Sequence, residues 1–378
     1  MSIYIKGFGQ TKFGELWEYD LRGLAIEAAL SAINSSNIDT KDIDAIYIGN
    51  MLGSKLSGQD HLGALIASEL GLSCPAIHVE AACASGGVAL RLACLDILSK
   101  NAKNILVIGV EKMTDVNVSD VTASLTGASD EEWEAFYGVT FPSLYAMIAR
   151  EHMNRFGTSK EHLAKVAIKN HKHGSMNKFA HFQNEIDMNE ALNSIMVADP
   201  LNLMDCSPVS DGASAIVLSS SKGCVEILTS VQAQDVLALH DRKDITTLHS
   251  TVQASKEAFK LANVKHSDIG VMEVHDCFTI AEICAYEDLG FVEKGKGSTL
   301  IESGETYYNG KLPVNTSGGL KAAGHPVGAT GIKQAIEIYL QLTGQAQARQ
   351  IKKEAKYGLA HNVGGSGSTA VVTIFKVL

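Results

Sequence analysis

Short runs of apolar residues alternate with stretches of helical periodicity along most of the chain. The runs at residues 45–48 and 76–79 predict buried strands, and a third strand is expected at residues 104–110. Between the second and third strands, residues 84–100 carry apolar side chains at the spacing of one helix face. Strands that alternate with helices in this way indicate an α/β fold.

One part of this pattern occurs twice. Residues 37–43, which precede the strand ending at Ile48, share Asn, Asp and Ile at matching offsets with residues 263–269, which precede a strand ending at Val274. An Ala-Lys pair likewise precedes both the strand at 104–110 and a later strand that ends at Ala360. Because the flanking helices recur as well, an internal duplication of one α/β unit explains the matches better than chance similarity does.

Residues 118–203 interrupt this pattern and are rich in His, Asn, Met and Lys, with helices expected near 143–155 and 159–173. Long insertions more often form substrate sites than structureless linkers, so this segment is interpreted as an inserted loop domain. The expected division is residues 1–117 plus 204–222 for the first half, 118–203 for the insertion and 223–378 for the second half. Candidates to line a substrate pocket there are Trp133, Phe136, Tyr137, Phe141 and Met147, although aromatic residues at such spacing are as often part of a core.

Composition narrows the function classes. A chain of 378 residues with 46% hydrophobic residues supports a large core, and a formal net charge of -10 argues against nucleic-acid binding. The cysteine count is seven, an odd number, and no spacing suggests zinc, which favours a reduced protein without a structural metal. Neither a signal peptide nor an apolar run of membrane-spanning length is evident, so a cytoplasmic protein is expected.

Cys83 is the first candidate for chemistry. It stands between a predicted strand and an apolar helix, in the segment EAACASGG at residues 80–87. A thiol at a helix start faces free backbone N–H groups and the positive end of the helix dipole, so a reactive thiolate is expected near neutral pH. The alternative is a buried structural cysteine, which is the usual state of an isolated free cysteine.

Two histidine segments could work with this thiol. His325 lies in GGLKAAGHPVGATG at residues 318–331, where the glycine density favours an imidazole presented to a ligand over one in a plain turn. His275 and Cys277, in HDCF at residues 275–278, follow the strand ending at Val274 and point to the same side. An acid/base pair fits them. A metal site competes, but no third and fourth ligand stands at suitable spacing.

A third segment, HNVGGSG at residues 361–367, forms a glycine-rich turn near the C-terminus. Such a turn either donates backbone N–H groups to an oxyanion or is an ordinary tight turn.

These segments, in this order and separation, resemble the thiolase superfamily over essentially the whole chain. The GHP motif at residues 324–326 and the CxS motif that begins at Cys83 carry the resemblance, together with SPVSDGA at residues 207–213. The chain departs from most bacterial and mitochondrial thiolases by having HDCF in place of Asn-Glu-Ala-Phe and Asn362-Val363-Gly364 in place of CxG. The HDCF form is similar to sterol-carrier-protein-type thiolases and archaeal acetyl-CoA acetyltransferases.

The resemblance implies two duplicated α/β halves in a layered α-β-α-β-α arrangement with an inserted loop domain. It also implies a role for each matching residue. Cys83 would be the acylated nucleophile, His325 its base, and Cys277 the acid/base that replaces the missing second cysteine. His275 and His325 would stabilise the enolate, and the N–H groups of Cys83 and Gly364 would hold the tetrahedral oxyanion. Ser207 is expected beside the pantetheine arm and Phe278 beside the substrate.

The implied activity is acetyl-CoA C-acetyltransferase, the reversible condensation of two acetyl-CoA, with coenzyme A thioesters as substrates and no cofactor. A homodimer or homotetramer packed through strands near residues 104–112 is implied, and archaeal relatives associate with HMG-CoA synthase through a zinc-ribbon/OB-fold protein. The alternatives are a longer-chain 3-ketoacyl-CoA thiolase, a decarboxylating ketoacyl synthase and a non-catalytic scaffold or lipid-binding protein.

Overall fold

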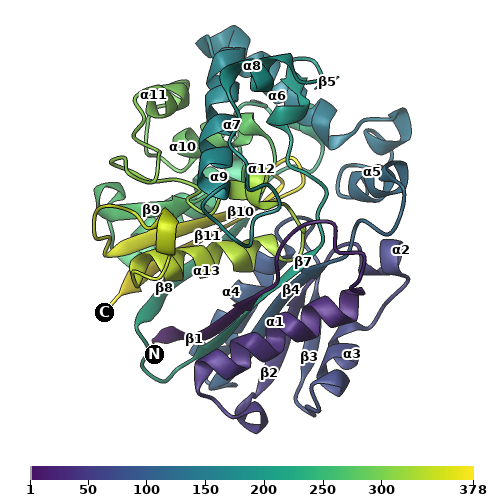
Figure 1. The fold of residues 1–378 in the computed structure, drawn as a ribbon, viewed down its shortest axis with the longest axis vertical. Helices are drawn as coiled ribbons and strands as arrows, with labels where there is room; N and C mark the ends of the chain where they lie inside the picture. The colour runs from purple at the N-terminus through teal and green to yellow at the C-terminus, as the bar shows by residue number, and fades with distance from the viewer. Residues whose placement is uncertain (1) are drawn as a thin grey trace.

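The computed structural model describes residues 2–378 and confirms the α/β fold (Figure 1). The first half contains β1 (Ile3–Gln10), α1 (Leu21–Ser36), β2 (Ala45–Gly49), α2 (Gly53–Ser57), α3 (Leu62–Glu69), β3 (Ala76–Val79), α4 (Ser85–Leu98), β4 (Asn104–Glu111) and β7 (Gly212–Ser219). The second half contains β8 (Val225–Gln234), α9 (His249–Ala262), β9 (Ile269–Glu273), α10 (Thr279–Asp288), α11 (Gly297–Glu302), α12 (Gly319–Ala323), α13 (Thr330–Leu342), β10 (Tyr357–Gly364) and β11 (Thr369–Val377).

The strands form one nine-stranded sheet in the order β3-β2-β4-β7-β1-β8-β11-β10-β9. The halves meet where β1 pairs antiparallel with β8. Helices α4 and α13 pack between the halves and share one apolar core with strands of both, while α1 and α3 cover the outer face of the first half and α9 that of the second (Figure 1). This order of layers is the predicted α-β-α-β-α arrangement.

The duplication is visible in the backbone. Asn37 ends α1 and Asn263 ends α9, both in the left-handed conformation, with φ of 56° and 51°. Asn tolerates this conformation better than most residues, which makes it suitable for ending a helix. In each half a short 3₁₀ turn follows, at Thr40–Asp42 and at His266–Asp268, and leads into the matching strand, β2 or β9.

Two expectations about the strands are wrong. Strand β4 is buried along its whole length between β2 and β7, so residues 104–112 have no free edge with which to contact a second copy. Strand β3, expected to be buried, is instead the terminal strand of the sheet, and Ile77 on it is 46% exposed. A short apolar run does not by itself distinguish an edge strand from a central one.

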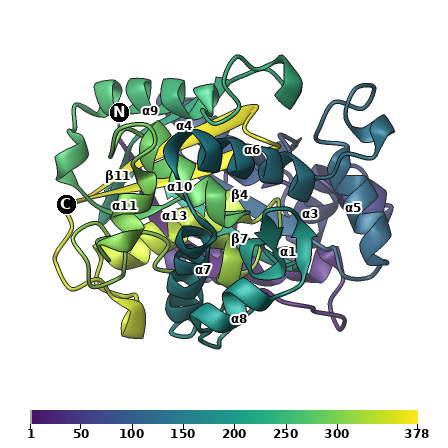
Figure 2. The ribbon, with the colours of Figure 1, turned by 90° about the horizontal axis from the view of Figure 1, so that it is seen from above.

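The insertion forms a helical layer at one end of the sheet (Figure 2). It contains α5 (Val118–Thr126), α6 (Phe141–Phe156), α7 (Lys160–Gly174), α8 (Met188–Asn193) and a small sheet of β5 (Met196–Ala198) and β6 (Leu201–Asn202). Helices α6 and α7 share an apolar core with α10 of the second half. No helix in residues 2–378 is long and apolar enough to cross a membrane.

Candidate active site

A strained turn presents Cys83 at the start of α4. Ala82 has φ of 52°, an uncommon conformation for a residue with a side chain. The turn is held by the Ser85 hydroxyl, which donates to the Ala82 carbonyl at 2.6 Å and accepts the Ala81 N–H at 2.9 Å. A backbone held in a sparsely populated conformation favours a functional role for the residue it aims, here the thiol.

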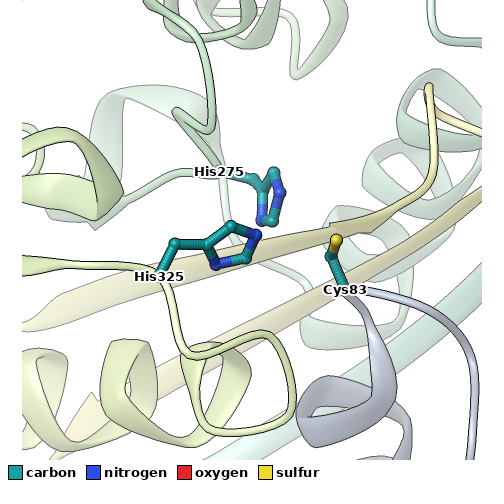
Figure 3. A group of neighbouring side chains, drawn as sticks. All are labelled: Cys83, His275 and His325. Carbon is teal, nitrogen blue, oxygen red and sulfur yellow. The ribbon is translucent and has the colours of Figure 1, made fainter. Parts of the chain in front are cut away.

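The fold brings two side chains that are distant in sequence to this thiol. Cys83, His275 and His325 each offer one ligand atom, and these atoms lie within 4.8 Å of one another (Figure 3). The two imidazole rings are 5.1 Å apart between centroids and nearly perpendicular, at 83°. Sequence spacing revealed no third ligand for a metal ion, whereas the structure brings three candidate ligand atoms together. Whether the cluster suits a metal ion or another ligand depends on which ring nitrogens carry protons, and the hydrogen bonds decide this.

His325 carries its proton on Nδ1. The Thr330 hydroxyl donates to the Pro326 carbonyl at 3.0 Å, so it can only accept from His325 Nδ1, 2.7 Å away. The Nε2 lone pair is buried and has no hydrogen-bond partner among the described residues. Burial, assisted by the positive charge of Lys333, lowers the pKa of His325 to about 3. His325 is therefore a neutral imidazole with a free basic nitrogen in the site.

His275 has the opposite arrangement because of Asn362. The Asn362 Oδ1 accepts the Gly87 N–H at 3.1 Å, which orients its amide nitrogen toward the Cys83 carbonyl at 3.0 Å and His275 Nδ1 at 3.3 Å. Because Nδ1 accepts, the proton is on Nε2, which is buried and has no hydrogen-bond partner within residues 2–378. Burial also holds the pKa of His275 well below its usual range. A protonated Nε2 binds an oxygen rather than a metal ion, so the cluster suits a carbonyl substrate.

The expectation of a resting Cys83 thiolate is wrong. Burial raises the pKa of the Cys83 thiol to about 12, and the nearby Glu111 carboxylate acts in the same direction. The Gly365 N–H and the N–H of Cys83 itself oppose this shift but do not outweigh it. The thiol must therefore lose its proton as it attacks, and His325 Nε2 is the free base beside it.

The glycine beside the sulfur is Gly365 and not Gly364. Gly365 lines the cavity, and its N–H points at Cys83. Gly364 ends β10 and packs against the cysteine turn, where an added Cβ would lie 2.6 Å from the Ala81 carbonyl oxygen. The structure therefore favours the N–H groups of Cys83 and Gly365 as the oxyanion donors.

The sulfur faces a mostly apolar cavity of ≈ 160 Å³. Its lining includes Cys83, Phe141, Tyr145, Ser207, Cys277, Phe278 and His325. The Ser207 N–H donates to the Cys277 carbonyl at 2.9 Å, which links the segment returning from the insertion to the HDCF segment. Burial raises the pKa of Cys277 well above its usual range, so this residue rests as a thiol.

Of the five insertion residues expected to line this cavity, Phe141 does so. Trp133, Phe136 and Tyr137 are largely exposed, and Met147 is 45% exposed, so their assignment is wrong. The cavity instead receives Tyr145, which the sequence did not single out. Tyr145 belongs to the predicted helix at 143–155, and no motif distinguished it from the other apolar positions of that helix.

The duplicated fold and the buried cysteine beside two imidazoles define the class of the protein, an α/β enzyme whose site is arranged around a thiol. The chain belongs to the thiolase family: the model of the thiolase N-terminal domain matches residues 3–222, and that of the thiolase C-terminal domain-like family matches residues 231–377.

Two archaeal relatives place the chain within the family, and one solved structure shares its fold. An acetyl-CoA acetyltransferase of Methanothermobacter thermautotrophicus is 49% identical over 99% of both chains. One of Methanocaldococcus jannaschii is 45% identical over 99% of this chain and 98% of its own length. The solved structure of an Ltp2-ChsH2(DUF35) aldolase superposes with a TM-score of 0.86 over 100% of this chain and 98% of that one, at 21% identity, which supports the fold alone.

Proposed function

We propose that the chain is an acetyl-CoA C-acetyltransferase, which condenses two acetyl-CoA into acetoacetyl-CoA and CoA and catalyses the reverse thiolysis. Two archaeal acetyl-CoA acetyltransferases that are 49% and 45% identical to the chain over nearly its full length support this activity. The observation that carries the proposal is the buried thiol beside one imidazole with a free lone pair and another with a free N–H. No cofactor is needed, because groups of the chain suffice for every step below.

The first half-reaction transfers the acetyl group to Cys83. His325 Nε2 takes the thiol proton while the sulfur attacks the thioester carbon. The N–H groups of Cys83 and Gly365 stabilise the oxyanion. When the tetrahedral intermediate collapses, the C–S bond to CoA breaks and the CoA thiolate takes the proton from His325. Free CoA leaves, and the acetyl group stays on Cys83.

The second half-reaction forms the carbon–carbon bond. The Cys277 thiol first loses its proton to solvent. The thioester oxygen of a second acetyl-CoA accepts the His275 Nε2–H, which stabilises the enolate as the resulting Cys277 thiolate removes the α-proton. The α-carbon attacks the acetyl carbon, and the bond to the Cys83 sulfur breaks as acetoacetyl-CoA forms. The Cys83 sulfur leaves as a thiolate and takes a proton from solvent, so both cysteines return to the thiols that began the cycle. In thiolysis Cys277 begins as a thiol, which is the state that burial favours at rest, and gives its proton to the acetyl-CoA carbanion.

Some expectations from the family resemblance remain proposals. They are a homodimer or homotetramer, contact with Ser207 by the pantetheine arm, a cytoplasmic location, and assembly with HMG-CoA synthase through a zinc-ribbon/OB-fold protein.

Trapping of the acetyl-enzyme tests the nucleophile. After incubation with radiolabelled acetyl-CoA, the native protein should carry one acid-stable label per chain, whereas Cys83→Ala should carry none. Cys94→Ala is a matched control, since Cys94 is also buried on α4 and burial also raises its pKa to about 12. Label on Cys83→Ala would reject the assignment.

Substrate comparison separates the alternative activities. Acetoacetyl-CoA should be cleaved faster than longer 3-oxoacyl-CoA, and condensation should proceed without a malonyl thioester. Faster cleavage of longer chains would indicate a 3-ketoacyl-CoA thiolase. A requirement for malonyl-CoA would indicate a ketoacyl synthase, and failure to cleave acetoacetyl-CoA with CoA would indicate a non-catalytic protein.

A further inference from the structure

Tyr145 brings a polar group from the insertion into the cavity. Its side chain is 1% exposed, and its ring stacks on Phe278 with 4.6 Å between centroids and an interplanar angle of 27°. Its hydroxyl donates to the Gly365 carbonyl at 3.2 Å. Buried hydroxyl groups usually have a hydrogen-bond partner, and this one has the Gly365 carbonyl. Tyr145 lines the same cavity as Cys83 and Cys277.

The same hydroxyl lies near Cys277, because Tyr145 and Cys277 line one cavity and the Tyr145 ring stacks on Phe278, the residue that follows Cys277. Burial raises the pKa of the Cys277 thiol, and the neighbouring Cys83 acts in the same direction, whereas the Tyr145 hydroxyl opposes them. Burial also raises the pKa of Tyr145 well above its usual range, so the phenol stays protonated and has one O–H to donate. One donor therefore faces two acceptors, a carbonyl oxygen and a sulfur whose charge changes during the reaction.

We propose that Tyr145 is a positioning residue for the acid/base step, whose hydroxyl donates to Gly365 while Cys277 is a thiol and donates to the Cys277 sulfur when that sulfur is a thiolate. The proposal rests on the proposed function. A hydrogen bond to a charged acceptor is roughly twice as strong as one between neutral groups, so the hydroxyl stabilises the thiolate more than the thiol. The base of the condensation step thus depends on the insertion, which also lines the cavity.

Tyr145→Phe tests this role because it removes the hydroxyl and keeps the stacked ring. Exchange of label between CoA and acetyl-CoA reports the Cys83 half-reaction and should stay within about twofold of the native rate. Condensation should fall roughly 10- to 100-fold, the range expected for one hydrogen bond to a charged group. Since less thiolate forms without the hydroxyl, the rise of the condensation rate with pH should move to higher pH, by about one unit or more.

Tyr286→Phe is the matched control. Tyr286 is fully buried and its hydroxyl donates to Glu282, outside the cavity. This variant reports the general effect of deleting a buried phenol oxygen and should leave the pH profile of condensation unchanged.

Each outcome decides the proposal. Equal loss of exchange and condensation in Tyr145→Phe, or a loss without a pH shift, would assign Tyr145 a structural role and overturn it, as would unchanged condensation. If Tyr145→Phe does not fold, difluorotyrosine at position 145 replaces it: a more acidic donor of nearly the same shape should move the pH profile to lower pH, and an unmoved profile would overturn the proposal. Native protein that neither exchanges nor condenses would refute the proposed function instead.

Discussion

Replacement of Asn362 by aspartate should change the tautomer of His275, so that the ring proton moves from Nε2 to Nδ1. The carboxylate keeps the shape of the amide and still accepts the Gly87 N–H, but it replaces the N–H donor that faces His275 Nδ1 at 3.3 Å. His275 would then donate Nδ1–H to the carboxylate, and its Nε2 would become a lone pair. The substrate oxygen would lose the hydrogen bond that stabilises the enolate.

The size of the effect follows from the loss of one donor. Removal of a single oxyanion donor lowers turnover by roughly 10²–10³, or about 2.7–4 kcal/mol. The variant also loses the 3.0 Å hydrogen bond from Asn362 to the Cys83 carbonyl, which destabilises the protein by about 1–3 kcal/mol. A typical domain has about 5–15 kcal/mol of stability, so the variant should still fold.

Acetoacetyl-CoA thiolysis at saturating substrates measures the loss, with thermal unfolding as a check on folding. Asn177→Asp is the control, since this buried amide donates to the Ser317 carbonyl outside the cavity. The new carboxylate should also raise the pKa of His275, so lowering the pH should protonate the ring, restore Nε2–H and recover part of the activity. Near-native thiolysis by Asn362→Asp, or activity that falls further as pH is lowered, would refute the assigned tautomer.

Three further changes probe the same geometry. Alkylation of Cys83 by iodoacetamide should rise about tenfold per pH unit from about pH 7 to about pH 10, because burial raises the thiol pKa to about 12 and only the thiolate reacts; a plateau near neutral pH would show a resting thiolate. Thr330→Val removes the acceptor of His325 Nδ1–H, so acetyl exchange should fall roughly tenfold or more, and an unchanged rate would mean that His325 is held otherwise. Gly86→Ala would place a Cβ 2.5 Å from the Gly328 carbonyl oxygen, so urea unfolding should show a loss of about 1–3 kcal/mol, and undiminished stability would contradict this packing.

The features that the sequence predicted are the local ones. Strands and helices were found from periodicity, and the duplication from Asn-Asp-Ile spacing, because helix ends and strand entries depend on a few neighbouring residues. The nucleophile and histidine candidates came from short motifs, and the structure brings Cys83, His275 and His325 together.

What the sequence missed depends on contacts between distant segments. The expected Cys83 thiolate followed from a helix start nearby, but desolvation by both halves outweighs that effect. The tautomer of His275 is set by Asn362, 87 positions away, and Tyr145 enters the cavity only because α6 packs on α10. The central position of β4 likewise depends on β7, which follows it only after the insertion.

The duplication itself explains why the nucleophile and its base meet. Helices α4 and α13 occupy equivalent places in the two halves, and Cys83 and His325 lie in the segments that lead into them. The helices approach closely because glycine lies at the contact: a Cβ on Gly86 would be 2.5 Å from the Gly328 carbonyl oxygen, and one on Gly331 would be 2.3 Å from the Gly87 nitrogen. Two copies of one α/β unit thus direct two helix N-termini at one cavity, where their partial positive charges favour a developing oxyanion. The copies differ in the residue each presents there, a thiol in one and an imidazole in the other, and this difference converts a symmetric helix contact into a nucleophile and its base.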